Sequence, residues 1–203
     1  MSLNILQQLQ ENFESLYRLD PAPKVTEFVL EQNSQRREQL LILEEDDLYL
    51  GLVLDPAVPL HLQDPALRPE NLQEFCLAVE GVSHFLFVIF CARQERRVTA
   101  LEIELQGEVD KYVASLILAN RSPSLPAQHL RSRLYDHFHL LSDLDPMEQR
   151  RYWKANTLAR SYTHTLEQRF ISKQRFSAMM TELRQFYRMC YQCKQELIAL
   201  QTL

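Results

Sequence analysis

Between positions 80 and 110 the chain concentrates the residue types that bind metal ions or move protons. One histidine and four of the glutamates there form the candidate set: Glu80, His84, Glu102, Glu104 and Glu108. Carboxylate oxygens and imidazole nitrogens bind divalent cations, and a set rich in carboxylates suits Mg²⁺ or Mn²⁺. On a covered surface these side chains could serve a metal-dependent hydrolase or a phosphoryl-handling enzyme, with one carboxylate acting as general base.

An ordinary solvated strand would produce the same pattern. Residues 101–106 alternate between apolar and polar types, which predicts a strand with one face in the core. Glu102 and Glu104 then share the other face, which in an antiparallel sheet is commonly wet. His84 opens the preceding apolar strand, where a structural histidine is the commoner role. We therefore favour the structural interpretation, in which no cofactor is expected.

Cys190 and Cys193 have the CxxC spacing of redox and zinc pairs. Redox pairs usually lie at a helix amino terminus, whereas the apolar residues from 176 to 200 repeat at 3-4 spacing and predict one long helix. Both cysteines would then lie deep in that helix and pack in the core. The same apolar seam could pair two copies of the chain through Phe176, Met179, Leu183, Phe186 and Leu197.

A cluster of cations and aromatic residues follows position 149. Arg150, Arg151 and Lys154 could hold phosphates while Trp153 stacks on a base. The alternative is a solvated helix face with Trp153 buried in the core. We favour this alternative because the whole chain carries a net charge of −5 and repels nucleic acid at long range.

Several common types of active site are excluded by missing motifs. The chain has only three glycines, so it cannot build the glycine-rich loops that bind nucleotides. It also lacks the Gly-x-Ser-x-Gly motif of serine hydrolases and the HExxH motif of zinc proteases. Four cysteines in a cytosolic chain predict no structural disulfide.

The elements that would position these residues follow from the hydrophobic periodicity. We expect a helix over 3–16, a hairpin of strands 39–43 and 48–54, a helix over 71–79, a second hairpin of strands 83–92 and 101–106, and a helix over 109–117. Asp145, Pro146 and Glu148 predict a capped helix start. The sequence therefore predicts an α+β fold, with an antiparallel sheet of about four to five strands, flanking helices and a carboxy-terminal helical hairpin packed on the sheet.

Charge divides the chain into two parts. Residues 1–126 contain 10 Lys and Arg against 20 Asp and Glu, whereas residues 127–203 contain 12 against 7. We expect an acidic α+β domain and a basic helical extension that form one compact unit. Neither a run of about 20 apolar residues nor a secretory signal is present, so we predict a cytoplasmic protein without membrane contact.

These features lead to three functional hypotheses. We favour a non-catalytic protein-interaction module, adaptor-like or chaperone-like, whose partner is another protein or a second copy of the chain as a homodimer. The alternative is the metal-dependent enzyme built on the glutamate cluster. Nucleic-acid binding through the basic helices is the third hypothesis.

Overall fold

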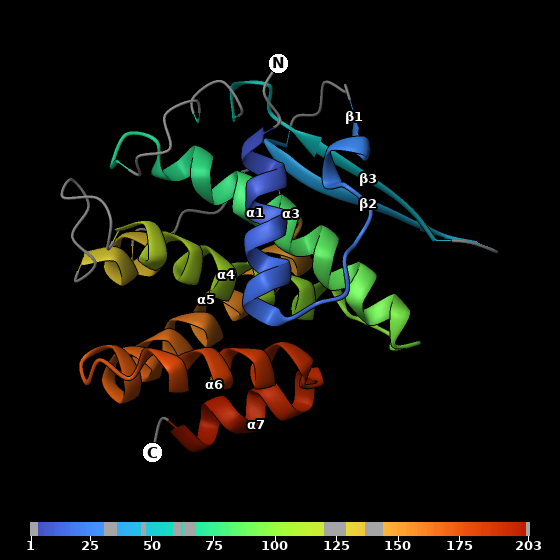
Figure 1. Cartoon of the computed structure of the whole chain (residues 1–203). Coiled ribbons are helices and arrows are strands. Elements are labelled where there is room, and N and C mark those ends of the chain that lie inside the picture. Colours follow the sequence, from blue (N-terminus) through green and yellow to red (C-terminus); the bar gives the residue numbers. More distant parts are fainter. Residues whose placement is uncertain are drawn as a thin grey trace.

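The computed structural model describes residues 4–30, 36–45, 48–58, 62, 68–119, 129–136 and 144–201. Of these described residues 71% are helical (Figure 1). The main elements are α1 (Asn4–Tyr17), β1 (Val29–Leu30), β2 (Glu38–Glu44), β3 (Leu48–Leu54), α3 (Leu72–Arg93), α4 (Ala100–Ala119), α5 (Pro146–Leu166), α6 (Phe176–Arg188) and α7 (Tyr191–Gln201). Short helical turns lie at Val25–Glu27, Ser132–Asp136 and Glu167–Ile171.

The sheet is smaller than the sequence predicts. Among the described residues it has three strands in the order β1-β3-β2, with β1 parallel and β2 antiparallel to β3. The predicted antiparallel sheet of four to five strands is therefore wrong. The β2–β3 hairpin is confirmed, and it pairs Glu38 with Leu54 at one end and Glu44 with Leu48 at the other.

The two segments predicted to form the second hairpin are helices instead. The apolar run 83–92 lies in α3, which is buried on most sides because α1, α4 and the sheet all contact it. A helix covered in this way is apolar all round, and periodicity alone cannot distinguish it from a buried strand. The alternation at 101–106 lies in α4, which α3 and α5 cover from two sides. Glu102 and Glu104 are therefore both buried without sharing a face.

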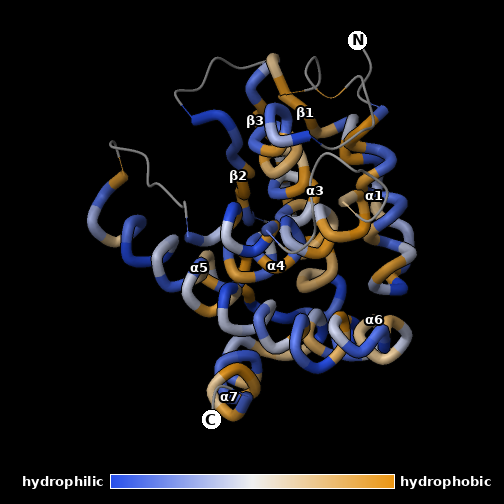
Figure 2. Tube along the Cα trace, turned by 90° about the vertical axis from the view of Figure 1, so that its left-hand side faces the viewer, coloured by the Kyte–Doolittle hydropathy of each residue, from blue (hydrophilic) through white to orange (hydrophobic). Residues whose placement is uncertain are grey.

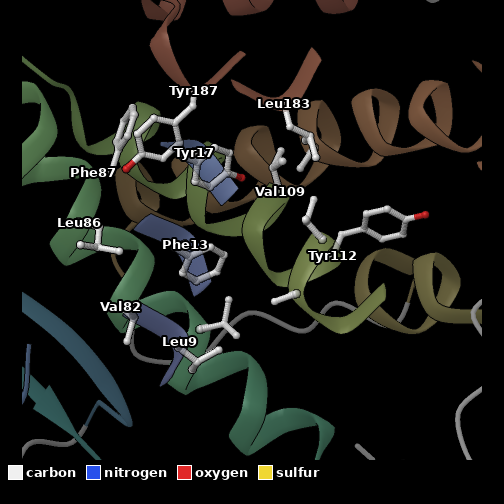
Figure 3. Packing of buried hydrophobic residues seen from close by; sticks show 14 of the residues in the cluster. Leu9, Phe13, Tyr17, Val82, Leu86, Phe87, Val109, Tyr112, Leu183 and Tyr187 are labelled. Atoms are coloured by element: carbon white, nitrogen blue, oxygen red, sulfur yellow. The ribbon is translucent and has the colours of Figure 1, made fainter. Parts of the chain in front are cut away.

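The core gathers around α3 and α4. Figure 2 shows the hydrophobic residues of these two helices in the middle of the molecule, and Figure 3 shows side chains from α1, α3, α4 and α6 meeting there. The rings of Tyr17 on α1 and Tyr187 on α6 stack with centroids 4.2 Å apart. A Cβ on Gly81 would lie 2.9 Å from a methyl group of Leu52, so this glycine lets the sheet approach α3 closely.

α3 is also long and apolar enough to cross a membrane, since its most apolar 18-residue window has a mean hydropathy of 2.0. However, 67% of that window is buried inside the protein. This burial is what a central core helix requires.

The carboxy-terminal helices differ from the predicted hairpin. α5 begins at the predicted capping box, in which the Asp145 carboxylate accepts hydrogen bonds from the N–H groups of Met147 and Glu148. α5 packs on α4 rather than on the sheet, and α6 contacts α1. The single long helix predicted from the apolar residues at 176–200 is wrong, because α6 ends at Arg188 and α7 starts at Tyr191.

The predicted self-association seam is divided by this break. Met179, Leu183 and Phe186 are buried in the core of the same chain, whereas the Phe176 side chain is 45% exposed. One cluster of buried residues extends from Leu6 to Ile198, so the amino-terminal and carboxy-terminal parts share a core. The predicted boundary between residues 126 and 127 lies outside the described residues.

Candidate metal centre

Four ionisable side chains converge where β2 meets α3 and α4. Glu38 is the first residue of β2, Glu80 and His84 lie one turn apart on α3, and Glu104 comes from α4. One ligand atom from each of Glu38, Glu80 and His84 lies within 4.8 Å of the others. The His84 Nε2 atom is 3.7 Å from a carboxylate oxygen of Glu104. We call these four residues the Glu38 cluster.

The Glu38 cluster is buried and incompletely hydrogen-bonded. The side chains of Glu38, His84 and Glu104 are 8%, 6% and 10% exposed. Glu38 Oε1 lies 3.5 Å from His84 Nδ1, and His84 Nε2 lies 3.7 Å from a carboxylate oxygen of Glu104. Neither contact has good hydrogen-bond geometry, so Glu38 Oε1 and His84 Nε2 have no hydrogen-bond partner. Leaving a buried polar atom unpaired costs about 1–3 kcal/mol. Both atoms can bind a metal ion, so the cluster offers two ligand atoms that no hydrogen bond uses.

A glycine on α4 makes room for the imidazole. A Cβ on Gly107 would lie 2.7 Å from His84 Nε2 and 3.2 Å from the Cδ2 atom of the ring. Real Cβ atoms do not approach other atoms this closely, so a larger residue at position 107 would push the ring away from Glu104. The backbone of α4 therefore helps to fix the position of His84.

Two permanent cations border the cluster. Lys111 donates hydrogen bonds to Glu80 at 3.1 Å and to Glu108 at 2.8 Å, and Arg151 on α5 lies 3.5 Å from Glu104. The carboxylates that face these two cations are Glu38, Glu80, Glu104 and Glu108. Four negative and two positive charges leave a net charge of two negative when His84 is neutral. A divalent cation would balance this charge.

The electrostatics of the cluster favour bound positive charge. Burial lowers the pKa of His84, but the carboxylates of Glu38, Glu104 and Glu80 outweigh burial and raise this pKa from 6.5 to about 9. Burial raises the pKa of Glu104 to about 7, against the opposing effect of His84. Without a metal ion His84 is therefore protonated at neutral pH, and an ion bound to it must displace a proton.

The structure brings together three of the five residues that the sequence predicts as possible metal ligands. Glu80, His84 and Glu104 are in the cluster, and Glu108 is linked to it through Lys111. Glu102 points elsewhere and pairs with Arg96 at 2.6 Å. Two residues on a helix are turned by about 200° from each other when they are two positions apart, so the predicted shared face of Glu102 and Glu104 does not exist.

Sequence reasoning missed Glu38. This residue opens a hairpin strand, and nothing in its local pattern indicates that it is buried against α3. The spacing of Glu80 with His84 and of Glu104 with Glu108 is four residues, which places each pair on one helix face. Had the helices been recognised, this spacing would have indicated the site.

A second buried polar group lies on the opposite side of α4. Asp110 accepts hydrogen bonds from Tyr17, from Ser83 at 2.5 Å and from Gln106 at 3.0 Å. Lys194 on α7 donates to Gln106 at 3.0 Å and lies 4.4 Å from the centre of the Phe87 ring. Burial lowers the pKa of Lys194 to about 8. All of these residues are at most 2% exposed, so the group joins α1, α3, α4 and α7 as a structural network.

A cavity of about 570 Å³ lies beside the carboxyl end of α1. Its lining includes Arg93, which donates to the carbonyls of Asp20 and Pro21, and Arg188, which donates to the carbonyls of Tyr17 and Arg18. Cations at a helix carboxyl end satisfy free carbonyls and oppose the helix dipole. We therefore assign these arginines a structural role at the end of α1.

The residues predicted to contact nucleic acid separate on α5. Arg150, Trp153 and Lys154 line a shallow pocket, whereas Arg151 turns toward Glu104. The Trp153 side chain is 56% exposed, so its expected place in the core is wrong. Nucleic-acid binding stays the third hypothesis, which the acidic net charge of the chain disfavours.

Comparison of the chain with known proteins found no matching family model, no similar curated protein and no similar solved structure.

Proposed function

We propose that the protein binds one divalent cation at the Glu38 cluster. The observation that carries this proposal is the convergence of Glu38, Glu80 and His84 ligand atoms within 4.8 Å, with buried, unpartnered atoms on Glu38 and His84. Once a bound ion displaces the His84 proton, the four carboxylates and two cations leave two negative charges, which supports a divalent ion. An imidazole among the ligands favours Mn²⁺, Fe²⁺ or Zn²⁺ over Mg²⁺ and Ca²⁺.

The bound ion would connect the sheet to the helices. Glu38 belongs to β2, whereas Glu80 and His84 belong to α3. One ion would therefore link two elements whose nearest ligands, Glu38 and Glu80, are 42 residues apart in the sequence. The cluster is nearly closed to solvent, and neither the cavity beside α1 nor the pocket on α5 is lined by its residues. These features support a structural or metal-sensing role over hydrolysis of a substrate.

Calorimetric titration of Mn²⁺ into chelator-treated protein tests the proposal. We expect one ion per chain, and affinity at least about tenfold weaker in Glu38→Gln and in His84→Gln, because each change removes a ligand. Glu44→Gln is the matched control, since Glu44 is exposed at the other end of the same strand. Equal affinities in all four proteins, or no binding by the wild type at millimolar Mn²⁺, would refute the proposal.

The exposed hairpin supports a second function, a protein interaction through β2. Five large apolar side chains on β2 and β3 are 37–55% exposed: Leu41, Ile42, Leu43, Leu48 and Tyr49. The hairpin extends beyond the helices (Figure 1), and among the described residues β2 is an edge strand that pairs with β3 alone. Exposed apolar edges add strands from other chains. We propose that the occupant is a second copy, whose β2 pairs with this one.

Sedimentation velocity tests the second function. We expect a concentration-dependent dimer of the wild type and a monomer of Ile42→Lys, because a charge at the centre of the edge opposes strand pairing. Lys24→Ala, in the exposed segment between α1 and β1, should leave the dimer unchanged. A wild type that is monomeric across the micromolar range would exclude this mode of association.

A further inference from the structure

The two cysteines expected in the core lie instead at an exposed helix start. α7 begins at Tyr191, so Cys190 immediately precedes the helix and Cys193 lies in its first turn. Both side chains are exposed, and their sulfur atoms are 3.0 Å apart. Among the described residues these are the cysteines that solvent reaches most freely, since Cys91 is buried and Cys76 is partly buried.

The break between α6 and α7 creates this arrangement. Met189 has extended backbone angles (φ −67°, ψ 147°), which end α6. The Arg96 guanidinium donates a hydrogen bond to the Met189 carbonyl at 3.3 Å and connects the break to the end of α3. Cys190 is thereby turned out of the seam that the 3-4 spacing predicts, and the first N–H groups of α7 are directed toward its sulfur.

The local contacts give the two thiols different reactivity. The Cys193 N–H donates to the Cys190 sulfur at 3.4 Å, and the positive end of α7 favours a thiolate there. The contact with the Cys193 thiol, and then the hydrogen bond from the Cys193 N–H, lowers the pKa of Cys190. The same thiol contact raises the pKa of Cys193. Cys190 is therefore the thiol that ionises first.

We propose that Cys190 and Cys193 form a thiol–disulfide exchange site for low-molecular-weight disulfides of the glutathione class, with Cys190 as the attacking and Cys193 as the resolving sulfur. This site is separate from the Glu38 cluster, and its assignment does not depend on metal binding. The spacing, the exposure and the sulfur contact are the features shared by redox pairs at helix amino termini.

The exchange proceeds in two balanced steps. The Cys190 thiolate attacks one sulfur of glutathione disulfide, the S–S bond of glutathione breaks, and one glutathione leaves as a thiolate that takes up a proton. Cys193 then loses its proton to water, and its sulfur attacks Cys190. The mixed disulfide breaks and releases the second glutathione. The two cysteines are oxidised to one disulfide, and glutathione disulfide is reduced to two thiols.

Intact-mass measurement of the full chain treated with glutathione disulfide tests this proposal. We expect the wild type to lose two hydrogen atoms per chain. Cys193→Ser should retain one glutathione, because the resolving sulfur is missing. Cys190→Ser should react at least about tenfold more slowly, since the stabilised thiolate is absent. Cys76→Ser is the matched control and should behave as the wild type, because burial raises the pKa of Cys76 to about 12.

Two results would overturn the proposal. One is a wild type that forms no intramolecular disulfide while the urea-unfolded chain does. The other is equal or faster glutathione capture by Cys190→Ser than by Cys193→Ser. Circular dichroism of each variant shows whether the fold is retained. The rate of iodoacetamide alkylation, measured against pH, shows independently which of the two thiols ionises first. We expect Cys190 to be alkylated at lower pH than Cys193, and the reverse order contradicts the assignment.

Discussion

The metal-free protein should lose stability as the pH rises, because His84 is held in its protonated form. The difference between an ordinary histidine pKa of 6.5 and a pKa of about 9 corresponds to about 3 kcal/mol of folding free energy. A raised pKa in the folded state means that this stabilisation is complete below pH 6.5 and is lost as the pH passes 9. His84 is buried, so little solvent screening reduces the effect.

Urea unfolding of chelator-treated wild type and His84→Gln between pH 6 and 9.5 measures this effect. Other groups also titrate in this range, since burial raises the pKa of Glu104 to about 7 and lowers that of Lys194 to about 8. Both proteins contain these groups, so subtracting one unfolding free energy from the other reduces the contribution of Glu104 and Lys194. We expect the stability advantage of the wild type to fall by about 3 kcal/mol from pH 6 to pH 9.5. His164→Gln, on the exposed side of α5, is the control.

The groups that face His84 come from four elements. They are Glu38 from β2, Glu80 from α3, Glu104 and Glu108 with Lys111 from α4, and Arg151 from α5. Because their charges are coupled to that of His84, imidazole NMR provides the direct measurement. A His84 pKa below 7, or a stability difference that is the same at pH 6 and pH 9.5, would refute the electrostatic reasoning.

Three further predictions follow from particular contacts. Gly107→Ala should weaken Mn²⁺ binding by at least about tenfold, because its Cβ would displace the His84 ring; titration calorimetry against wild type checks this, and unchanged affinity contradicts it. Leu183→Ala should lower the free energy of unfolding by about 2–5 kcal/mol, whereas Leu200→Ala, with a 72% exposed side chain, should change it little; equal effects in urea would contradict the assignment of Leu183 to the core. Single-stranded oligonucleotide should not be retained in a salt-dependent way, because Arg151 faces Glu104 and the chain is acidic; retention that weakens with salt and in Arg150→Ala with Lys154→Ala would restore the nucleic-acid hypothesis.

Local signals in the sequence predict the elements whose periodicity or capping is distinctive. The first helix, the β2–β3 hairpin and the capped start of α5 are confirmed. Patterns fail where burial is complete. The apolar run in α3 has no polar side, so its helical period is hidden, and the alternation at 101–106 imitates a strand because α4 is covered from two directions.

The candidate sites show the same limits. Glu80, His84 and Glu104 could be selected from residue type alone, but Glu38 joins them through a contact between β2 and α3 that no local pattern encodes. Cys190 and Cys193 have a recognisable spacing, yet their role depends on a helix break at Met189. The 3-4 repeat continues across this break, so the sequence predicts a core position for two side chains that are exposed.

Pulsed EPR of the Mn²⁺-loaded protein tests the central claim most directly, because coupling to ¹⁴N reveals an imidazole bound to the ion. We predict one Mn²⁺ per chain, with nitrogen coupling in the wild type and in Glu44→Gln and without it in His84→Gln. Failure of the wild type to bind Mn²⁺ stoichiometrically, or nitrogen coupling that persists in His84→Gln, would show that the Glu38 cluster is not the metal site.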